Sequence, residues 1–209
     1  MAHARSVQGH RDTRGPGLEG WHRIRARATK LAGQGVAGKR DLAIVRLLHD
    51  RGLRRGEAVA MDLDDVDLDA GKCGEIRIIG KGRQEVETLS INAPTRDALR
   101  AWIAARGRKA GPLFIRLDPG ASPEGLERLS GDAVERMVKR LSRGAGLSRE
   151  ARPHGLRHQA ITRLLDLSNG DVRRVLHFSR HLDPKTLLLY DDNRRDEGGV
   201  LTTMLGDDE

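Results

Sequence analysis

Residues 153–192 read PHGLRHQAITRLLDLSNGDVRRVLHFSRHLDPKTLLLYDD and contain the only tyrosine of the 209-residue chain. Pro153 suits the first position of a helix. His154 and Arg157 are three residues apart, so they share a face of the first turn, where backbone N–H groups also favour an anion. The helix has a buried side because apolar residues recur at helical spacing: Leu156, Ala160, Ile161, Leu164 and Leu165. This arrangement predicts a phosphate-binding site.

Two further helices are predicted in the rest of this stretch. Asn169-Gly170 interrupts the apolar pattern, and Asp171 can cap a short helix that runs to about Phe178. Asp183-Pro184 is typical of the start of a third helix, which contains Tyr190. An isolated phenol titrates near pH 10, so Tyr190 needs a proton acceptor and cationic neighbours to act as a nucleophile.

Upstream segments add helices and one β-hairpin. Apolar spacing predicts helices over about 21–32, 40–50, 54–61, 94–106 and 132–143, and Gly52 is expected to end the second of these in a left-handed turn. Between residues 62 and 91 the period changes to two. Strands are therefore predicted at 75–79 and 86–91, on either side of a tight turn at Gly80-Lys81-Gly82. Residues 113–115 are predicted to form a short edge strand.

Together these segments resemble the catalytic domain of the tyrosine recombinases, the phage-integrase family. His154, Arg157, His181 and Tyr190 keep the family's order of His-x-x-Arg, His and Tyr, with nine residues from His181 to Tyr190. Residues 51–57 look like the family's first arginine box, and residues 79–82 look like its hairpin lysine. The resemblance covers about residues 40–192. It implies an α+β fold: a mainly helical catalytic domain with a small antiparallel sheet, the hairpin lying at about 75–91.

The resemblance implies a site-specific DNA recombinase that cleaves and rejoins DNA through a covalent 3′-phosphotyrosine intermediate. In this mechanism Tyr190 is the nucleophile, His154 manages its proton, and Lys81 protonates the leaving 5′ oxygen. Arg54, Arg157 and His181 bind the phosphoryl oxygens. Arg55 is the alternative to Arg54. The implied catalytic residues are Arg54, Lys81, His154, Arg157, His181 and Tyr190.

Several of these residues have ordinary alternatives. An exposed arginine or a hairpin-tip lysine is usually a solvated surface group, and the same is true of a surface carboxylate such as Glu57, which the family pattern expects to orient Arg54 by ion pairing. In the family, the helix equivalent to residues 132–143 lies along DNA. That would place four basic side chains near backbone phosphates, although a solvated helix face is equally open: Arg136, Lys139, Arg140 and Arg143.

Composition agrees with a polyanionic partner. Lys and Arg total 38 against 30 acidic residues, which gives a net charge of +8 and a pI near 10.3. The single cysteine, Cys73, excludes an internal disulfide and fits a reducing compartment. No apolar run approaches the roughly 18 residues that span a bilayer. We therefore expect a cytoplasmic, nucleoid-associated protein with no membrane contact. The resemblance implies no metal and no other cofactor.

The chain is expected to have three parts: a flexible leader at 1–17, the catalytic domain at 18–192 and a C-terminal tail at 193–209. Family members usually carry an N-terminal core-binding domain, which the residues before Arg40 are too few to encode. The resemblance implies double-stranded DNA as partner and a homo-oligomer, a tetramer, on that DNA. The tail either docks on a neighbouring protomer or packs on its own core. Two other functions stay open: DNA relaxation by a type IB topoisomerase, and a non-catalytic DNA-binding relic.

Overall fold

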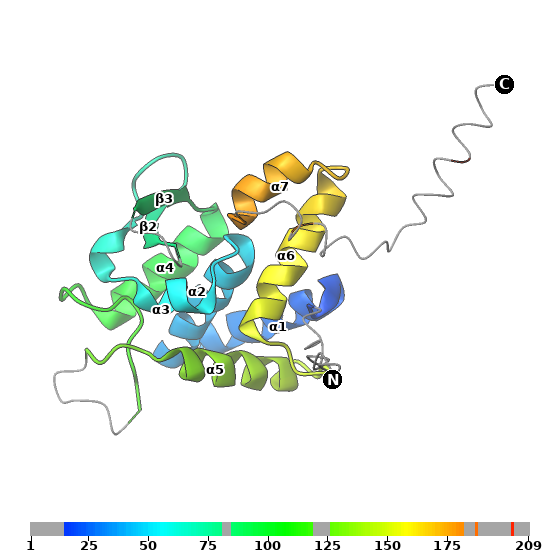
Figure 1. The fold of residues 1–209 in the computed structure, drawn as a ribbon. Coiled ribbons are helices and arrows are strands. Elements are labelled where there is room, and N and C mark those ends of the chain that lie inside the picture. The colour runs from blue at the N-terminus through cyan, green and yellow to red at the C-terminus, as the bar shows by residue number, and fades with distance from the viewer. Residues whose placement is uncertain (1–14, 81–84, 119–125, 182–186, 188–201, 203–209) are drawn as a thin grey trace, which may run out of the picture. The chain divides into compact units, whose positions relative to one another are not determined.

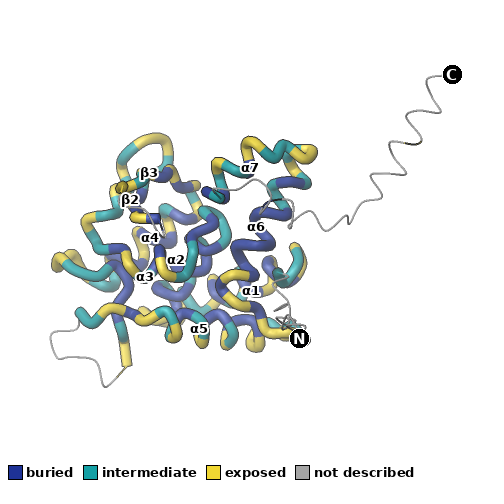
Figure 2. Tube along the Cα trace, viewed as in Figure 1, coloured by how far each residue is buried: buried dark blue, intermediate teal, exposed yellow. Residues whose placement is uncertain are grey.

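Helix α2 is the centre of the first of two compact units. A computed structural model describes residues 15–80, 85–118, 126–181, 187 and 202, and the chain divides into residues 1–159 and 160–209. In the first unit, α2 (Val36–Asp50) packs against α1 (Gly17–Ala32) and α4 (Ala93–Arg106) (Figure 1). Ala43, Ile44, Val45, Leu47 and Leu48 are fully buried, and Figure 2 shows α2 among the most buried segments. These apolar residues give α2 a wide buried face, as expected of a helix that packs against several neighbours.

The remaining helices of this unit begin where the sequence offers a cap. Helix α5 (Gly131–Gly144) starts after Ser130, whose side chain accepts a hydrogen bond from the N–H of Ala133 at 3.1 Å. Helix α4 starts after Asn92, whose side chain accepts from Thr95 N at 2.9 Å. Helix α3 (Arg55–Ala60) follows the turn at Gly52, and α6 (Pro153–Leu167) starts at Pro153.

The predicted hairpin is confirmed and gains a third strand. Strands β2 (Glu75–Ile79) and β3 (Val86–Ser90) pair antiparallel, with Ile79 opposite Val86. Strand β1 (Val66–Asp67) follows the 3₁₀ turn η1 (Leu63–Asp65) and pairs antiparallel with β2, so the sheet order is β1-β2-β3. The predicted α+β class, mainly helical with a small antiparallel sheet, is therefore correct.

The edge strand predicted at 113–115 does not form. These residues are buried, but only Ile115 forms a bridge, an isolated one with Arg128, and the neighbouring Pro112 forms another with Asp62. Trp102 occupies the space beside them and donates from Nε1 to the carbonyl of Leu113 at 2.9 Å. A short apolar run can be a buried strand or an irregular segment of the core, and composition alone does not distinguish the two. Here the run is an irregular core segment.

The second unit has a small core of its own. Helix α7 (Val172–Ser179) is capped by Asp171, which accepts from the N–H of Arg174 at 3.0 Å, as predicted. Ile161, Leu165, Val175 and Leu187 form the buried cluster. The third helix predicted from Pro184 falls almost wholly outside the described residues, as do most of the expected leader and most of the C-terminal tail.

Candidate active site

Arg54 lies in the turn between α2 and α3. Gly52 has a φ of 63°, a left-handed conformation that glycine adopts without strain, and it directs the chain from α2 toward α3. The buried carboxylate of Glu57 accepts from the backbone N–H and from Nη1 of Arg54, both at 2.8 Å. A buried carboxylate needs such a partner. The Arg54 side chain is thus held in place while 34% of it stays exposed, and the expected Arg54–Glu57 ion pair is confirmed.

Arg55, the alternative to Arg54, points to a different neighbour. Its Nη1 donates to Glu135 at 2.9 Å and to Asp132 at 3.4 Å, both on α5. These bonds tie α3 to α5. A guanidinium that already bridges two carboxylates has less to offer a phosphate than one held by a single carboxylate.

The first turn of α6 is joined to the Arg54 turn by Arg157. The Arg157 side chain is buried to 1% exposure, and its Nη1 donates to the backbone carbonyl of Gly52. His154, on the same face one turn earlier, is exposed but partly desolvated by its surroundings. That desolvation lowers the pKa of His154, and the positive charges of Arg157 and then of Arg54 lower it further. The three residues therefore form one electrostatic cluster.

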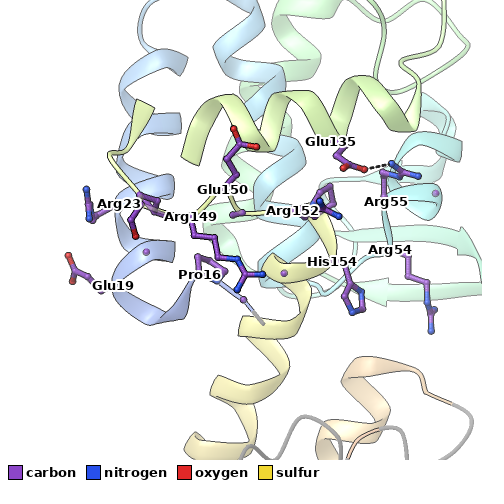
Figure 3. A pocket seen from close by; sticks show the side chains of 18 residues that line it. Pro16, Glu19, Arg23, Arg54, Arg55, Glu135, Arg149, Glu150, Arg152 and His154 are labelled. Carbon is purple, nitrogen blue, oxygen red and sulfur yellow. Dashed lines mark hydrogen bonds and ion pairs between the residues drawn. The ribbon is translucent and has the colours of Figure 1, made fainter. Parts of the chain in front are cut away.

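Arg54 and His154 open into the same cavity, which has a volume of about 1020 Å³. Its wall contains five arginines and three glutamates; the arginines are Arg23, Arg54, Arg55, Arg149 and Arg152. Figure 3 shows His154 and Arg54 side by side, on separate elements, at one end of this cavity. A basic cavity with a neutral imidazole at hand can bind an anion and accept a proton from a neighbouring group.

A polar network centred on His49 joins α1 and α2 to α6. The His49 ring contacts Asp50 Oδ1 through Nδ1 at 2.7 Å and Gln159 Oε1 through Nε2, and it stacks on Trp21 with ring centroids 3.7 Å apart. Burial alone would raise the pKa of Asp50, but hydrogen bonds from His49 and Arg46 hold that pKa below its usual value. Local sequence patterns do not reveal this network, because His49 and Gln159 are 110 residues apart and carry no shared motif.

Of the six predicted catalytic residues, the structure brings together Arg54, His154 and Arg157, all in the first unit. His181 is half-buried and belongs to the second unit. Lys81 and Tyr190 lie outside the described residues. The roles assigned to all six remain predictions.

The four basic residues predicted to contact DNA from α5 have different surroundings. Lys139 pairs with Glu135 at 3.0 Å, and Arg143 with Glu150 at 3.3 Å. Arg140 reaches Asp41, a buried carboxylate that also binds Arg40, at 2.7 Å. Arg136 is exposed and makes no ion pair with the residues that the structure describes. Arg136 is therefore the best placed of the four to meet a phosphate.

Two kinds of feature are absent from the described part of the chain. No group of three or more His, Cys, Asp and Glu side chains there is arranged to hold a metal ion. None of the described helices combines the length and the apolar character needed to cross a bilayer.

Comparison with known proteins identifies a consistent set of relatives. A model of the phage integrase family matches residues 23–197. A tyrosine recombinase of Synechocystis is 35% identical over 200 residues, which is 95% of this chain and 61% of the relative. A tyrosine recombinase XerC of Actinobacillus pleuropneumoniae is 32% identical over 154 residues, covering 72% of this chain and 46% of the relative. The chain thus spans 46–61% of the length of these relatives.

Solved structures have the same fold. XerH recombinase in a post-cleavage complex with its difH substrate matches with a TM-score of 0.73 and 22% identity, over 93% of this chain and 55% of that chain. XerA recombinase matches with a TM-score of 0.69, over 90% of this chain and 63% of that chain. At this level of identity the likeness establishes the architecture alone.

Proposed function

Because the chain belongs to the phage integrase family, we propose that it cleaves and rejoins DNA as the catalytic part of a site-specific recombinase. The observation that carries the proposal is the convergence of Arg54, His154 and Arg157. These residues come from segments a hundred positions apart, and two of them open into one basic cavity. An isolated surface arginine or histidine would not be tied to its neighbours in this way.

The chemistry is transfer of a phosphoryl group from DNA to tyrosine and back. The phenol oxygen of Tyr190 forms a bond to a backbone phosphorus while the bond from that phosphorus to the 5′ oxygen breaks. His154, neutral because its pKa is lowered, accepts the proton of Tyr190. Lys81 returns a proton to the 5′ oxygen. The reverse steps reseal the strand, and the phosphotyrosine conserves the energy of the phosphodiester, so neither ATP nor a metal is required.

Arg54, Arg157 and His181 would stabilise the charge that accumulates on the phosphoryl oxygens. Glu57 and the Gly52 carbonyl already hold Arg54 and Arg157, so these cations need little rearrangement when the charge develops. Fixed donors of this kind are effective because the protein has met the cost of ordering them during folding. Loss of one typically slows a reaction about 100-fold to 1000-fold.

The partner is double-stranded DNA, and we propose a homotetramer on that DNA. The net charge of +8 supports binding to a polyanion. The similar XerH and lambda integrase structures were both solved with their DNA sites bound, the lambda integrase as a dimer. Recombination joins two DNA sites. A type IB topoisomerase would instead relax supercoiled plasmid without exchanging partners, so relaxation and two-site recombination assays separate the two activities.

Covalent capture tests the proposal. The protein is incubated with nicked duplexes whose sequence is randomised around the nick, since loss of the short fragment traps the cleaved state. A denaturing gel then reveals DNA attached to protein. We expect an adduct with the native chain and none with Tyr190→Phe, a clean control because no other tyrosine exists. An equal adduct from both proteins, or none from either on any duplex, would exclude the function.

A further inference from the structure

The cavity at Arg54 and His154 continues well past these two residues. It runs along the start of α6 to the segment that joins α5 to α6, where Arg149 and Arg152 form its wall. Ligand pockets of roughly 300–1000 Å³ enclose most of a drug-sized molecule, whereas this cavity measures about 1020 Å³. One phosphate group at Arg54 and His154 would leave most of the space unfilled.

Three arginines and His154 follow one another across this cavity. Figure 3 shows Arg149, Arg152, His154 and Arg54 in that order from left to right, from the α5–α6 segment to the turn before α3. A concave site lined by charges of one sign concentrates their field, so this row of arginines raises the local positive potential. An elongated anion with several charges fits such a row better than a compact anion does.

The acidic residues in the wall do not cancel this potential. Glu135 is already bound by Lys139 at 3.0 Å and by Arg55 at 2.9 Å, and these two contacts, with a smaller effect of the Arg152 charge, lower its pKa. Glu150 is paired with Arg143 at 3.3 Å. The third, Glu19, is exposed on α1, away from Arg54 in Figure 3. Glu135 and Glu150 are thus each already paired with a cation outside the row, although the charge of Arg152 also acts on Glu135.

Within the described part of the chain, the Arg152 side chain has the fewest internal contacts of the three arginines in the row. Arg152 is exposed, and its side chain makes no hydrogen bond or ion pair with any residue that the structure describes, although its charge acts on Glu135. Arg54, by contrast, is held by Glu57, and Arg23 donates to the carbonyl of Gly146 at 2.7 Å. The Arg152 guanidinium can therefore bind a ligand without breaking an internal contact.

We propose that Arg152, assisted by Arg149, forms a second anion subsite that binds a backbone phosphate next to the one cleaved, on the same DNA strand. This inference rests on the proposed function, since it takes the phosphate at Arg54 and His154 as the reacting one. A guanidinium binds phosphate oxygens with paired N–H donors. The second contact fixes the direction in which the strand crosses the cavity and so positions the reacting phosphate.

Salt dependence of binding provides the first test. Two proteins are compared: the Tyr190→Phe parent, which cannot cleave, and the same protein with Arg152→Ala added. Their affinities for a duplex recovered by covalent capture are measured at several salt concentrations. Each phosphate contact contributes about −0.9 to the slope of log affinity against log salt concentration. If Arg152→Ala removes one contact, its slope should be less steep by about 0.9. The parent's advantage in affinity over the variant should then fall about 3-fold when the salt concentration is raised fourfold. Arg152→Lys should keep the slope. Arg108→Ala, an exposed arginine beside a different cavity, is the matched control.

Neutral backbone linkages provide the second test. A methylphosphonate replaces single phosphates on either side of the cleaved one. We expect Arg152→Ala to weaken binding to normal DNA but to cost nothing further when one of the two adjoining phosphates is neutral, and the affected side gives the strand direction. An unchanged salt slope, or an equal loss on every modified duplex, would overturn the subsite. Failure of the proposed function is recognised separately, as the absence of any covalent adduct from the native chain.

Discussion

Arg157, buried within the first turn of α6, donates a hydrogen bond to the backbone carbonyl of Gly52, in the turn that carries Arg54. Two segments that are 105 residues apart are thereby joined at the point where both contribute to the cavity. The contact uses a glycine carbonyl, so it depends on the backbone shape of the Gly52 turn rather than on a second side chain. Arg157 is thus a structural residue in addition to the catalytic role that we propose for it.

Replacement of Arg157 should therefore affect stability and reaction together. Arg157→Ala removes this buried hydrogen bond, and a hydrogen bond from a charged group typically contributes about 1.5–3 kcal/mol. We expect urea denaturation to give an unfolding free energy lower by about that amount, and single-turnover cleavage to slow about 100-fold to 1000-fold. A variant with native stability and a native cleavage rate would contradict the assigned role.

Glu57→Gln should disturb the orientation of the Arg54 guanidinium while leaving the positive charge of Arg54 in place. The Arg54 backbone N–H and Nη1 bind different oxygens of Glu57, and glutamine has only one oxygen, so the amide can accept from the backbone but no longer from Nη1. Because the Arg54 guanidinium is then less well fixed, we expect cleavage to slow about 10-fold while the affinity for DNA is kept. Glu19→Gln, an exposed carboxylate at the same cavity, is the control and should cleave at the native rate. Equal effects of the two substitutions would show that Glu57 has no special role.

The pH dependence of His154 follows from its lowered pKa. Below about pH 6.5 an unfolded histidine binds a proton, whereas folded His154 resists protonation because of desolvation and the charges of Arg157 and Arg54. The unfolded state then binds more protons, so this residue makes folding less favourable as the pH falls below about 6.5. His154→Gln should therefore lose less stability than the parent between about pH 7 and pH 5. An NMR titration of the His154 ring with a midpoint at or above about 6.5 would refute this prediction.

Gly56 allows the cavity to be closed without disturbing the core. It lines the cavity, and a Cβ built at this glycine meets no atom within 4 Å. Gly56→Ala, inside α3, should stabilise the fold by up to about 1 kcal/mol because alanine loses less backbone entropy. Gly56→Leu should also fold, as thermal unfolding can verify, but its side chain would occupy the cavity and weaken DNA binding. Identical DNA binding by the alanine and leucine variants would argue against DNA entering there.

Local pattern predicted the parts of this fold that depend on neighbours in sequence. The cap at Asp171 and the left-handed Gly52 both involve residues within a few positions of one another, whereas the Arg54–Glu57 pair, equally local, was expected from the family resemblance. The two-residue strand β1 has too little sequence to show a period, and the buried segment 113–115 resembled a strand in composition only.

Contacts between distant segments could not be predicted in the same way. Arg140 meets the buried Asp41 across 99 positions, so a residue predicted to be an α5 phosphate contact is also an anchor for a core carboxylate. The His49–Gln159 contact is similarly remote. For Arg54, His154 and Arg157 the family's order of residues supplied a relationship that spacing along one helix could not.

The most direct test of the account is the identity of the atom that becomes attached to DNA. Protein captured on the nicked duplex is digested with protease and nuclease, and the peptide that carries the remaining nucleotide is sequenced by mass spectrometry. The account predicts a single modified peptide with a 3′-phosphate esterified to Tyr190, the only tyrosine in the chain. A nucleotide on any other residue, a 5′ linkage, or cleaved DNA that carries no protein would contradict it.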